Sequence, residues 1–249
     1  IQKMYQEIQE NIAPRLLVDK SPSSSINRAI LERAESLFAN SKYIHLVRHP
    51  YSVIESFVRM RMQKLAGFGD ENPYQVAEQI WTKSNQNILD FLTEIEPERQ
   101  HQMRYEELVK EPNNILSQLC DFLNIDFDSA LLQPYKGDRM TEGVYESSLS
   151  ISDPNFLKHN SVDSSLGDKW KTIQLPHQLG EETRQIAKQL NYELPNQLDR
   201  LSPVSNSEVS ITPPRKNQQE EKFLEFKGKQ ICLCSWGSQN HPFCFEHTI

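Results

Sequence analysis

The stretch YIHLVRHPYSVIESF, residues 43–57, decides the fold. Residues 43–47 are mostly apolar without a polar alternation, which is typical of a strand buried on both faces. Residues 48–50 form a turn, and apolar residues recur at helical spacing from Val53 onward, with a proline near the first turn, where a helix tolerates it. The stretch therefore predicts a buried strand, a turn and an amphipathic helix.

The preceding segment has the same order of elements. Residues 16–20, LLVDK, form a short apolar run, and the Ser- and Pro-rich residues 20–25 interrupt it. Apolar residues then recur at helical spacing between Ile26 and Phe38. Two consecutive strand–helix units predict an α/β fold in which helices flank a parallel sheet.

Further elements are expected downstream. A long helix should begin after Asn72, a typical N-cap, and a third strand should cover residues 101–105. Periodicity is lost from 132 to 165, and a loop of about 30 residues inside a compact domain is usually functional or mobile. The other expected helices cover residues 106–109, 113–123 and 176–190.

The composition favours a soluble globular protein. Of the 249 residues 37% are apolar and 24% charged, and the formal net charge is −7. A negative chain has no overall basic field for nucleic acid or an anionic membrane, so we expect neither as a partner. No segment has the roughly 18–20 apolar residues that a membrane span needs, and we expect a cytoplasmic location.

The C-terminal fifth of the chain differs in composition. Residues 198–222 are rich in Ser, Pro, Asn, Gln and charge, which indicates a flexible linker. Residues 223–249 return to apolar alternation with Lys227-Gly228 at a turn, which predicts a short β-hairpin piece. The spacing of Cys232, Cys234 and Cys244 matches no common zinc site, so we expect no bound metal.

The turn after residues 43–47 carries the sharpest chemical signal. Arg48 follows the carboxyl end of a strand, where open α/β sheets bind ligands, and can form a charge-assisted fork to a phosphate. Ser52 and Ser56 stand one helical turn apart and could donate hydroxyls to it. The pattern outlines a phosphate site; alternatively, Arg48 pairs with a carboxylate and both serines face solvent.

This segment resembles the 3′-phosphate-binding motif of sulfotransferases that use 3′-phosphoadenosine-5′-phosphosulfate (PAPS). VDKSPS at 18–23 resembles the family element in which a lysine, here Lys20, approaches the sulfuryl group. RYEELV at 104–109, followed by Pro112, resembles a further family element.

A fourth match in the same order is LGDKWK at 166–171. It resembles the Gly-x-x-Trp segment that closes over the nucleotide, and this implies nucleotide contacts for Gly167, Lys169, Trp170 and Lys171. Because the four matches span about residues 14–195, we interpret residues 1–197 as a sulfotransferase domain with a fold like that of P-loop kinases.

The family also has a phosphate loop after its first strand, and nothing in the sequence matches it. We therefore interpret the domain as incomplete at its N-terminus, and expect these 249 residues alone to bind nucleotide weakly without turnover.

The resemblance implies transfer of a sulfuryl group from PAPS to a hydroxyl acceptor. Lys20 suits stabilisation of the departing phosphate. The histidine that many family members carry two residues after this lysine is replaced by Pro22, so the candidate base is His159, with Glu142 as a weaker alternative. Either Lys20 or His159 could instead be an ordinary surface residue.

Residues 223–249 are similar to the opening strands of α/β-hydrolases. A sulfotransferase, a linker and a truncated thioesterase-like start resemble the sulfotransferase–thioesterase tandem of certain polyketide synthases. That resemblance implies a hydroxyl on an acyl chain held by an acyl carrier protein as acceptor. Two other readings stay open, a non-catalytic remnant or scaffold and a P-loop nucleoside or sugar kinase.

Overall fold

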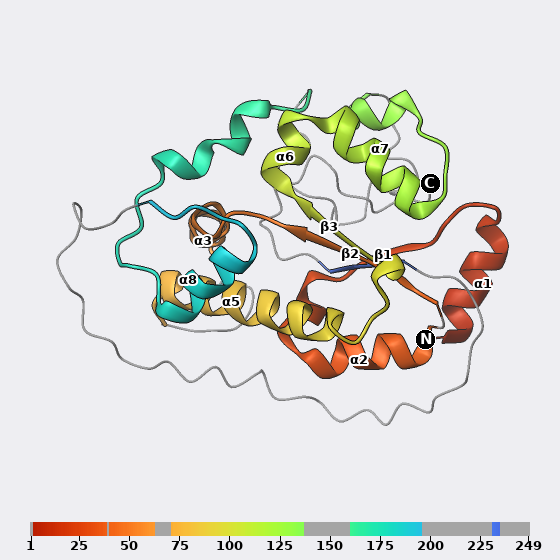
Figure 1. Ribbon diagram of the computed structural model, residues 1–249, viewed down its shortest axis with the longest axis horizontal. Coiled ribbons are helices and arrows are strands. Elements are labelled where there is room, and N and C mark those ends of the chain that lie inside the picture. Colours follow the sequence, from red (N-terminus) through yellow and green to blue (C-terminus); the bar gives the residue numbers. More distant parts are fainter. Residues whose placement is uncertain (1, 39, 63–70, 137–159, 196–230, 235–249) are drawn as a thin grey trace, which may run out of the picture.

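A parallel sheet lies between two layers of helices (Figure 1). The structure, a computed structural model, describes residues 2–38, 40–62, 71–136, 160–195 and 231–234. The strands stand in the order β1-β4-β2-β3, and each pairs in parallel with its neighbours. Their bounds are Val18–Lys20 for β1, Lys42–Val47 for β2, Gln100–Arg104 for β3 and Ile231–Cys234 for β4. The predicted fold class is confirmed.

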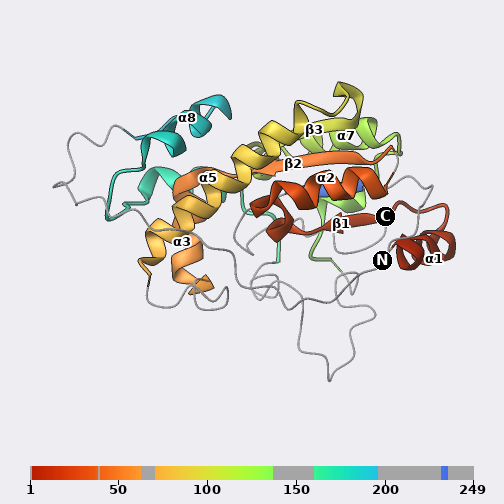
Figure 2. The ribbon, with the colours of Figure 1, turned by 90° about the horizontal axis from the view of Figure 1, so that it is seen from below.

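The helices fall into groups on the two faces of the sheet (Figures 1 and 2). One face carries α6 (Tyr105–Lys110) and α7 (Pro112–Leu123); the other carries α2 (Arg28–Leu37) and α5 (Pro73–Leu92). Helices α3 (Pro50–Arg59) and α8 (Glu181–Gln189) pack on α5 near the carboxyl ends of the strands, and α1 (Gln2–Ile12) lies at the opposite end. The short 3₁₀ helices are η1 (Pro22–Ile26), η2 (Pro97–Arg99), η3 (Ser129–Leu132), η5 (Ser164–Gly167) and η6 (Lys169–Thr172).

Strand β2 is apolar throughout because both its faces are covered. Ile44 and Leu46 belong to the core cluster shared with α6 and α7. Tyr43 packs with residues of α2 and α5, and Val47 packs against Trp81 of α5. The absence of alternation in the sequence thus reflects burial on two sides.

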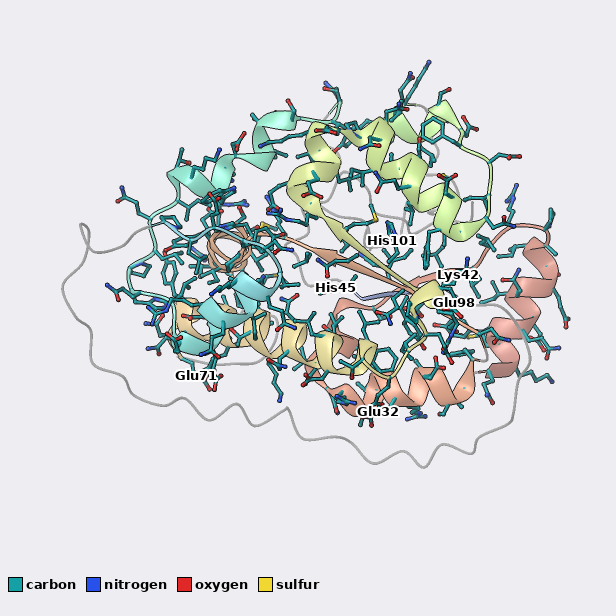
Figure 3. All side chains as sticks on the ribbon, in the orientation of Figure 1. Glu32, Lys42, His45, Glu71, Glu98 and His101 are labelled. Atoms are coloured by element: carbon teal, nitrogen blue, oxygen red, sulfur yellow. The ribbon has the colours of Figure 1, made fainter. Side chains whose placement is uncertain are left out.

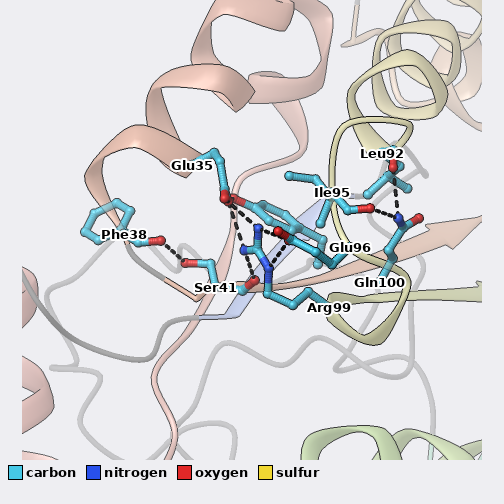
Figure 4. A network of polar contacts seen from close by, with 9 residues as sticks. Glu35, Phe38, Ser41, Leu92, Ile95, Glu96, Arg99 and Gln100 are labelled. Carbon is cyan, nitrogen blue, oxygen red and sulfur yellow. Dashed lines mark hydrogen bonds and ion pairs between the residues drawn. The ribbon is translucent and has the colours of Figure 1, made fainter.

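One polar network fixes the loop before β3 to α2 (Figure 4). The guanidinium of Arg99 donates to both oxygens of Glu35, at 2.6 and 3.1 Å, and to the carbonyl of Ser41 at 2.8 Å. The hydroxyl of Tyr43 in β2 donates to Glu35 as well. Helix α2, β2 and the start of β3 are therefore held at one point.

Helix α8 begins at Glu181, five residues later than predicted. Residues before it are drawn onto α5 by the buried carboxylate of Glu78, which accepts from His177 Nε2 at 2.6 Å and from Gly180 N at 2.6 Å. Leu175 and Leu179 are buried in the cluster around α3 and α5. These contacts are not local in sequence, so helical periodicity alone could not set the start of the helix.

Strand β4 lies between β1 and β2 and pairs with both. The sequence predicts a strand here, and the strand is observed, but its partners belong to the main sheet and no hairpin neighbour is among the described residues. Residues 198–222, 223–230 and 235–249 lie outside the described part, so the division into domain, linker and hydrolase-like start stays a prediction. No helix in the described ranges has the length and apolar character to cross a membrane.

Candidate functional site

Arg48 occupies the junction between β2 and α3. It directly follows the last residue of β2 and precedes the N-cap of α3. Its side chain is buried, and its guanidinium carbon lies 4.2 Å from the ring centroid of Tyr105. Its carbonyl accepts a hydrogen bond from Trp81 Nε1 at 3.0 Å. A buried cation thus stands at the N-terminus of a helix, where the helix dipole also favours an anion.

The two serines predicted for the phosphate site are also buried. Ser52 and Ser56 are 2% and 1% exposed, so the alternative that they face solvent is wrong. Ser52 Oγ has no hydrogen-bond partner among the described residues. Ser56 Oγ accepts from Arg59 Nη2 at 3.1 Å, which leaves the Ser56 hydroxyl proton able to donate elsewhere.

Arg59 is a second cation that the sequence analysis did not single out. It stands three residues after Ser56 on α3, and its Nε is paired with Glu55 Oε1 at 3.0 Å. Helical spacing could have found it, because residues three apart share a face.

Glu106, two residues after the end of β3, stabilises the junction between β2 and α3. Its Oε1 accepts from the backbone N–H of His49 at 2.9 Å, and its Oε2 accepts from the Tyr192 hydroxyl at 2.9 Å. Burial raises the pKa of this carboxyl, against these hydrogen bonds and the nearby charge of Arg48. The RYEELV segment therefore holds the β2–α3 turn in place.

The Gly167–Lys171 segment packs against this junction from a distant part of the chain. A Cβ on Gly167 would lie 2.9 Å from the carbonyl oxygen of Glu106 and 2.8 Å from Lys110 Cε, so only glycine allows this approach to α6. Trp170 stacks on the ring of His49 with centroids 4.1 Å apart and ring planes 10° apart.

The two lysines of this segment contact carboxylates. Lys169 Nζ lies 3.8 Å from Oε2 of Glu55, the neighbour of Ser56 on α3. Lys171 Nζ lies 2.6 Å from Oδ1 of Asp168, whose Oδ2 is 2.8 Å from Lys110. Lys169 therefore borders the serine-bearing helix, and Lys171 lies farther out.

Lys20 is the last residue of β1, at the carboxyl end of that strand. It is level with Ile44 of β2 through the intervening Leu233, so it lies four residues short of Arg48 along the strand direction.

The contacts described above bring six of the predicted site residues to the region around the β2–α3 junction: Arg48, Ser52, Ser56, Gly167, Lys169 and Trp170. His159 and Glu142 lie outside the described residues.

The described part of the chain holds no group of three or more His, Cys, Asp or Glu residues that could hold a metal ion. The expectation about Cys232, Cys234 and Cys244 stays a prediction.

The fold and site define a parallel α/β protein with a buried arginine just before a helix and two buried hydroxyls in the first two turns of that helix. Residues 2–129 match the profile of the sulfotransferase family. The chain belongs to that family.

Two solved structures are similar to this chain over 78% of its length. The sulfotransferase domain from the curacin biosynthetic pathway is 73% identical with a TM-score of 0.73, and this chain covers 69% of it. The sulfotransferase domain from the Synechococcus PCC 7002 olefin synthase is 47% identical with a TM-score of 0.70, and 65% of it is covered.

A protein-tyrosine sulfotransferase of Drosophila melanogaster is 23% identical over 179 residues, which make up 72% of this chain and 34% of that protein. This chain thus spans about a third of the length of that curated relative.

Replacing Gly167 by alanine tests the close approach to α6. The methyl group would overlap the Glu106 carbonyl, so we expect a loss of about 1–3 kcal/mol in the free energy of unfolding, measured with urea. Gly180→Ala is the matched control, because a Cβ there meets only Glu78 Oε1 at 3.5 Å, and it should cost less than about 1 kcal/mol. Equal losses would contradict the packing described.

The dependence of stability on pH tests two buried histidines. Burial lowers the pKa of His45 and the pKa of His49 from 6.5 to about 4. His45, labelled in Figure 3, contacts Asn85 of α5. As the pH falls, the unfolded chain therefore takes up a proton at each histidine before the folded chain does. The free energy of unfolding should fall as pH drops from 6.5 to 4, by up to about 3 kcal/mol for each ring.

Urea titrations at several pH values measure this fall. Asparagine at both positions should flatten it. The raised pKa of Glu106 acts in the opposite direction, but that carboxyl is kept in the variant, so the difference reports the histidines. A wild-type stability that stays constant from pH 6.5 to 5 would count against neutral, buried rings.

Proposed function

We propose that this chain carries the 3′-phosphate site of an enzyme that transfers a sulfuryl group from PAPS to a hydroxyl acceptor, with that phosphate held at the N-terminus of α3. The observation that carries the proposal is the buried Ser52 hydroxyl, which lacks a partner among the described residues and follows the buried Arg48 by four residues in sequence. A buried hydroxyl without a partner costs stability, and an anion at this position would satisfy it.

The residues of the site fit a phosphate group. Arg48 can donate charge-assisted hydrogen bonds, and the hydroxyls of Ser52 and Ser56 can donate from the same helix. The N-terminus of α3 adds the positive end of the helix dipole. The cation, the hydroxyls and the dipole all favour an anion at one place.

The Gly167–Lys171 segment would close this site. Gly167 brings the backbone near α6, and the stack on His49 holds Trp170 beside α3. Lys169 and Lys171 would add positive charge near the nucleotide once a phosphate competes with Glu55 and Asp168 for them. The side chains of both ion pairs are partly exposed to water, where such pairs contribute little to stability. Exchanging each carboxylate for a phosphate therefore costs little free energy.

Two residues are assigned to the chemical step. Lys20, on the carboxyl edge of the sheet, would stabilise charge on the departing phosphate as the bond from sulfur to its bridging oxygen breaks. His159 would take the proton of the acceptor hydroxyl as its oxygen bonds to sulfur, with Glu142 as the alternative base. In a form of the domain that also carries the family's phosphate loop, Lys20→Ala and His159→Ala should then lower the transfer rate more than nucleotide affinity.

The acceptor we propose is a hydroxyl on an acyl chain carried by an acyl carrier protein. The order of a sulfotransferase segment, a linker and a thioesterase-like start along the chain resembles a sulfotransferase–thioesterase tandem and supports this acceptor. The similar solved structures from the curacin pathway and the olefin synthase support it as well.

Ser52→Ala separates binding from folding. Removing a buried hydroxyl without a partner should leave the free energy of unfolding equal or slightly higher. The affinity for adenosine 3′,5′-bisphosphate should weaken about 10-fold, because one hydrogen bond to a charged group is lost. Titration calorimetry measures the affinity, and urea unfolding measures the stability.

The control is Ser84→Ala in α5, because the Ser84 hydroxyl is likewise buried without a partner in the described part of the chain. It should change stability in the same way and leave the affinity unaltered. Equal affinity for all three proteins would place the phosphate elsewhere, and no binding by the unaltered chain would favour the non-catalytic reading.

A further inference from the structure

His49 contacts three segments that are far apart in sequence. It caps α3, its ring stacks on Trp170, and its Nε2 donates to the carbonyl of Glu193 at 3.0 Å. The side chain is completely buried. Nothing local in the sequence shows that Trp170 and Glu193 meet this residue, because both lie more than 100 residues further along the chain.

We propose that His49 is the positioning residue for the Gly167–Lys171 segment and sets how that segment covers the phosphate site. This inference rests on the proposed function. It concerns a residue that does not itself touch the nucleotide and acts through Trp170.

The ring orientation is fixed by its two nitrogens. Nδ1 accepts from the backbone N–H of Tyr51 at 3.2 Å, and Nε2 donates to Glu193, so the partners assign the tautomer with the proton on Nε2. A rotated ring would lose both hydrogen bonds. The ring of Tyr192 meets it at 74° with centroids 5.2 Å apart, while Trp170 stacks nearly parallel to it.

The indole in turn fixes the lysines beside it. Trp170 stands between Lys169 and Lys171, and all three belong to the single 3₁₀ turn η6. Lys169 reaches Glu55 of α3 and Lys171 reaches Asp168. A displacement of the indole from His49 would therefore move both cations relative to Ser56.

The charge state of the ring suits this role. A neutral imidazole can accept from Tyr51 and donate to Glu193 at once, whereas a protonated ring has no acceptor. Arg48, Tyr51, Arg104, Glu106 and Tyr192 lie around it, and burial together with the two arginines opposes protonation. The Nδ1 cap on α3 is therefore kept at neutral pH.

A double-mutant cycle tests the inference. His49→Asn keeps a side-chain acceptor for the helix cap but is too short to stack on Trp170. We expect it to weaken adenosine 3′,5′-bisphosphate binding about 5- to 10-fold, a loss typical of one aromatic contact of about 1 kcal/mol. In a Trp170→Ala background the same change should have no further effect.

His101→Asn is the matched control, because it removes a comparable histidine stack, on Phe122 of α7, where His101 lies away from α3 (Figure 3). It should leave the affinity unaltered. Full affinity in His49→Asn, or losses that add in the double variant, would overturn the inference.

Hydrogen exchange tests the same point without nucleotide. In His49→Asn the amides of residues 167–172 should exchange faster than in the unaltered chain and in His101→Asn. Unchanged exchange would overturn the positioning role. If the unaltered chain binds no bisphosphate, the proposed function is refuted, but the exchange result still decides this inference.

Discussion

The burial of one guanidinium is the constraint on which the rest of the site depends. Arg48 is 2% exposed, and a buried cation is tolerated only where surrounding groups replace water. The register of the sheet supplies them, because Val47 pairs with Arg104 and the next residues, Arg48 and Tyr105, leave their strands side by side. The Tyr105 ring lies under the guanidinium, and the field of Arg48 acts on the buried carboxyl of Glu106. The parallel sheet is thus what permits an arginine at this position.

The same junction links the fold to the proposed chemistry. Glu106 accepts from the His49 backbone, the His49 ring holds Trp170, and Gly167 lies against the Glu106 carbonyl. Three stretches of sequence therefore meet around one turn, and each restrains the other two. The buried hydroxyl of Ser52 is the stability cost of that arrangement.

Much of this arrangement could be predicted from the sequence because it depends on local patterns. The strand predicted at residues 43–47 and the cap at Asn72 follow from periodicity and capping rules. The pairing of β4 with β1 and β2 could not, since a short apolar strand does not specify its partner. The contacts of His49 were missed for the same reason, and Arg59 was missed although its spacing from Ser56 marks it.

The central claim is that the 3′-phosphate of the nucleotide lies at the N-terminus of α3. A crystal structure of this chain with adenosine 3′,5′-bisphosphate is the most direct test. The account predicts phosphate oxygens within about 3 Å of the Arg48 guanidinium and of the hydroxyls of Ser52 and Ser56. A well-ordered nucleotide whose phosphates lie away from this helix, with Ser52 still without a partner, would contradict it.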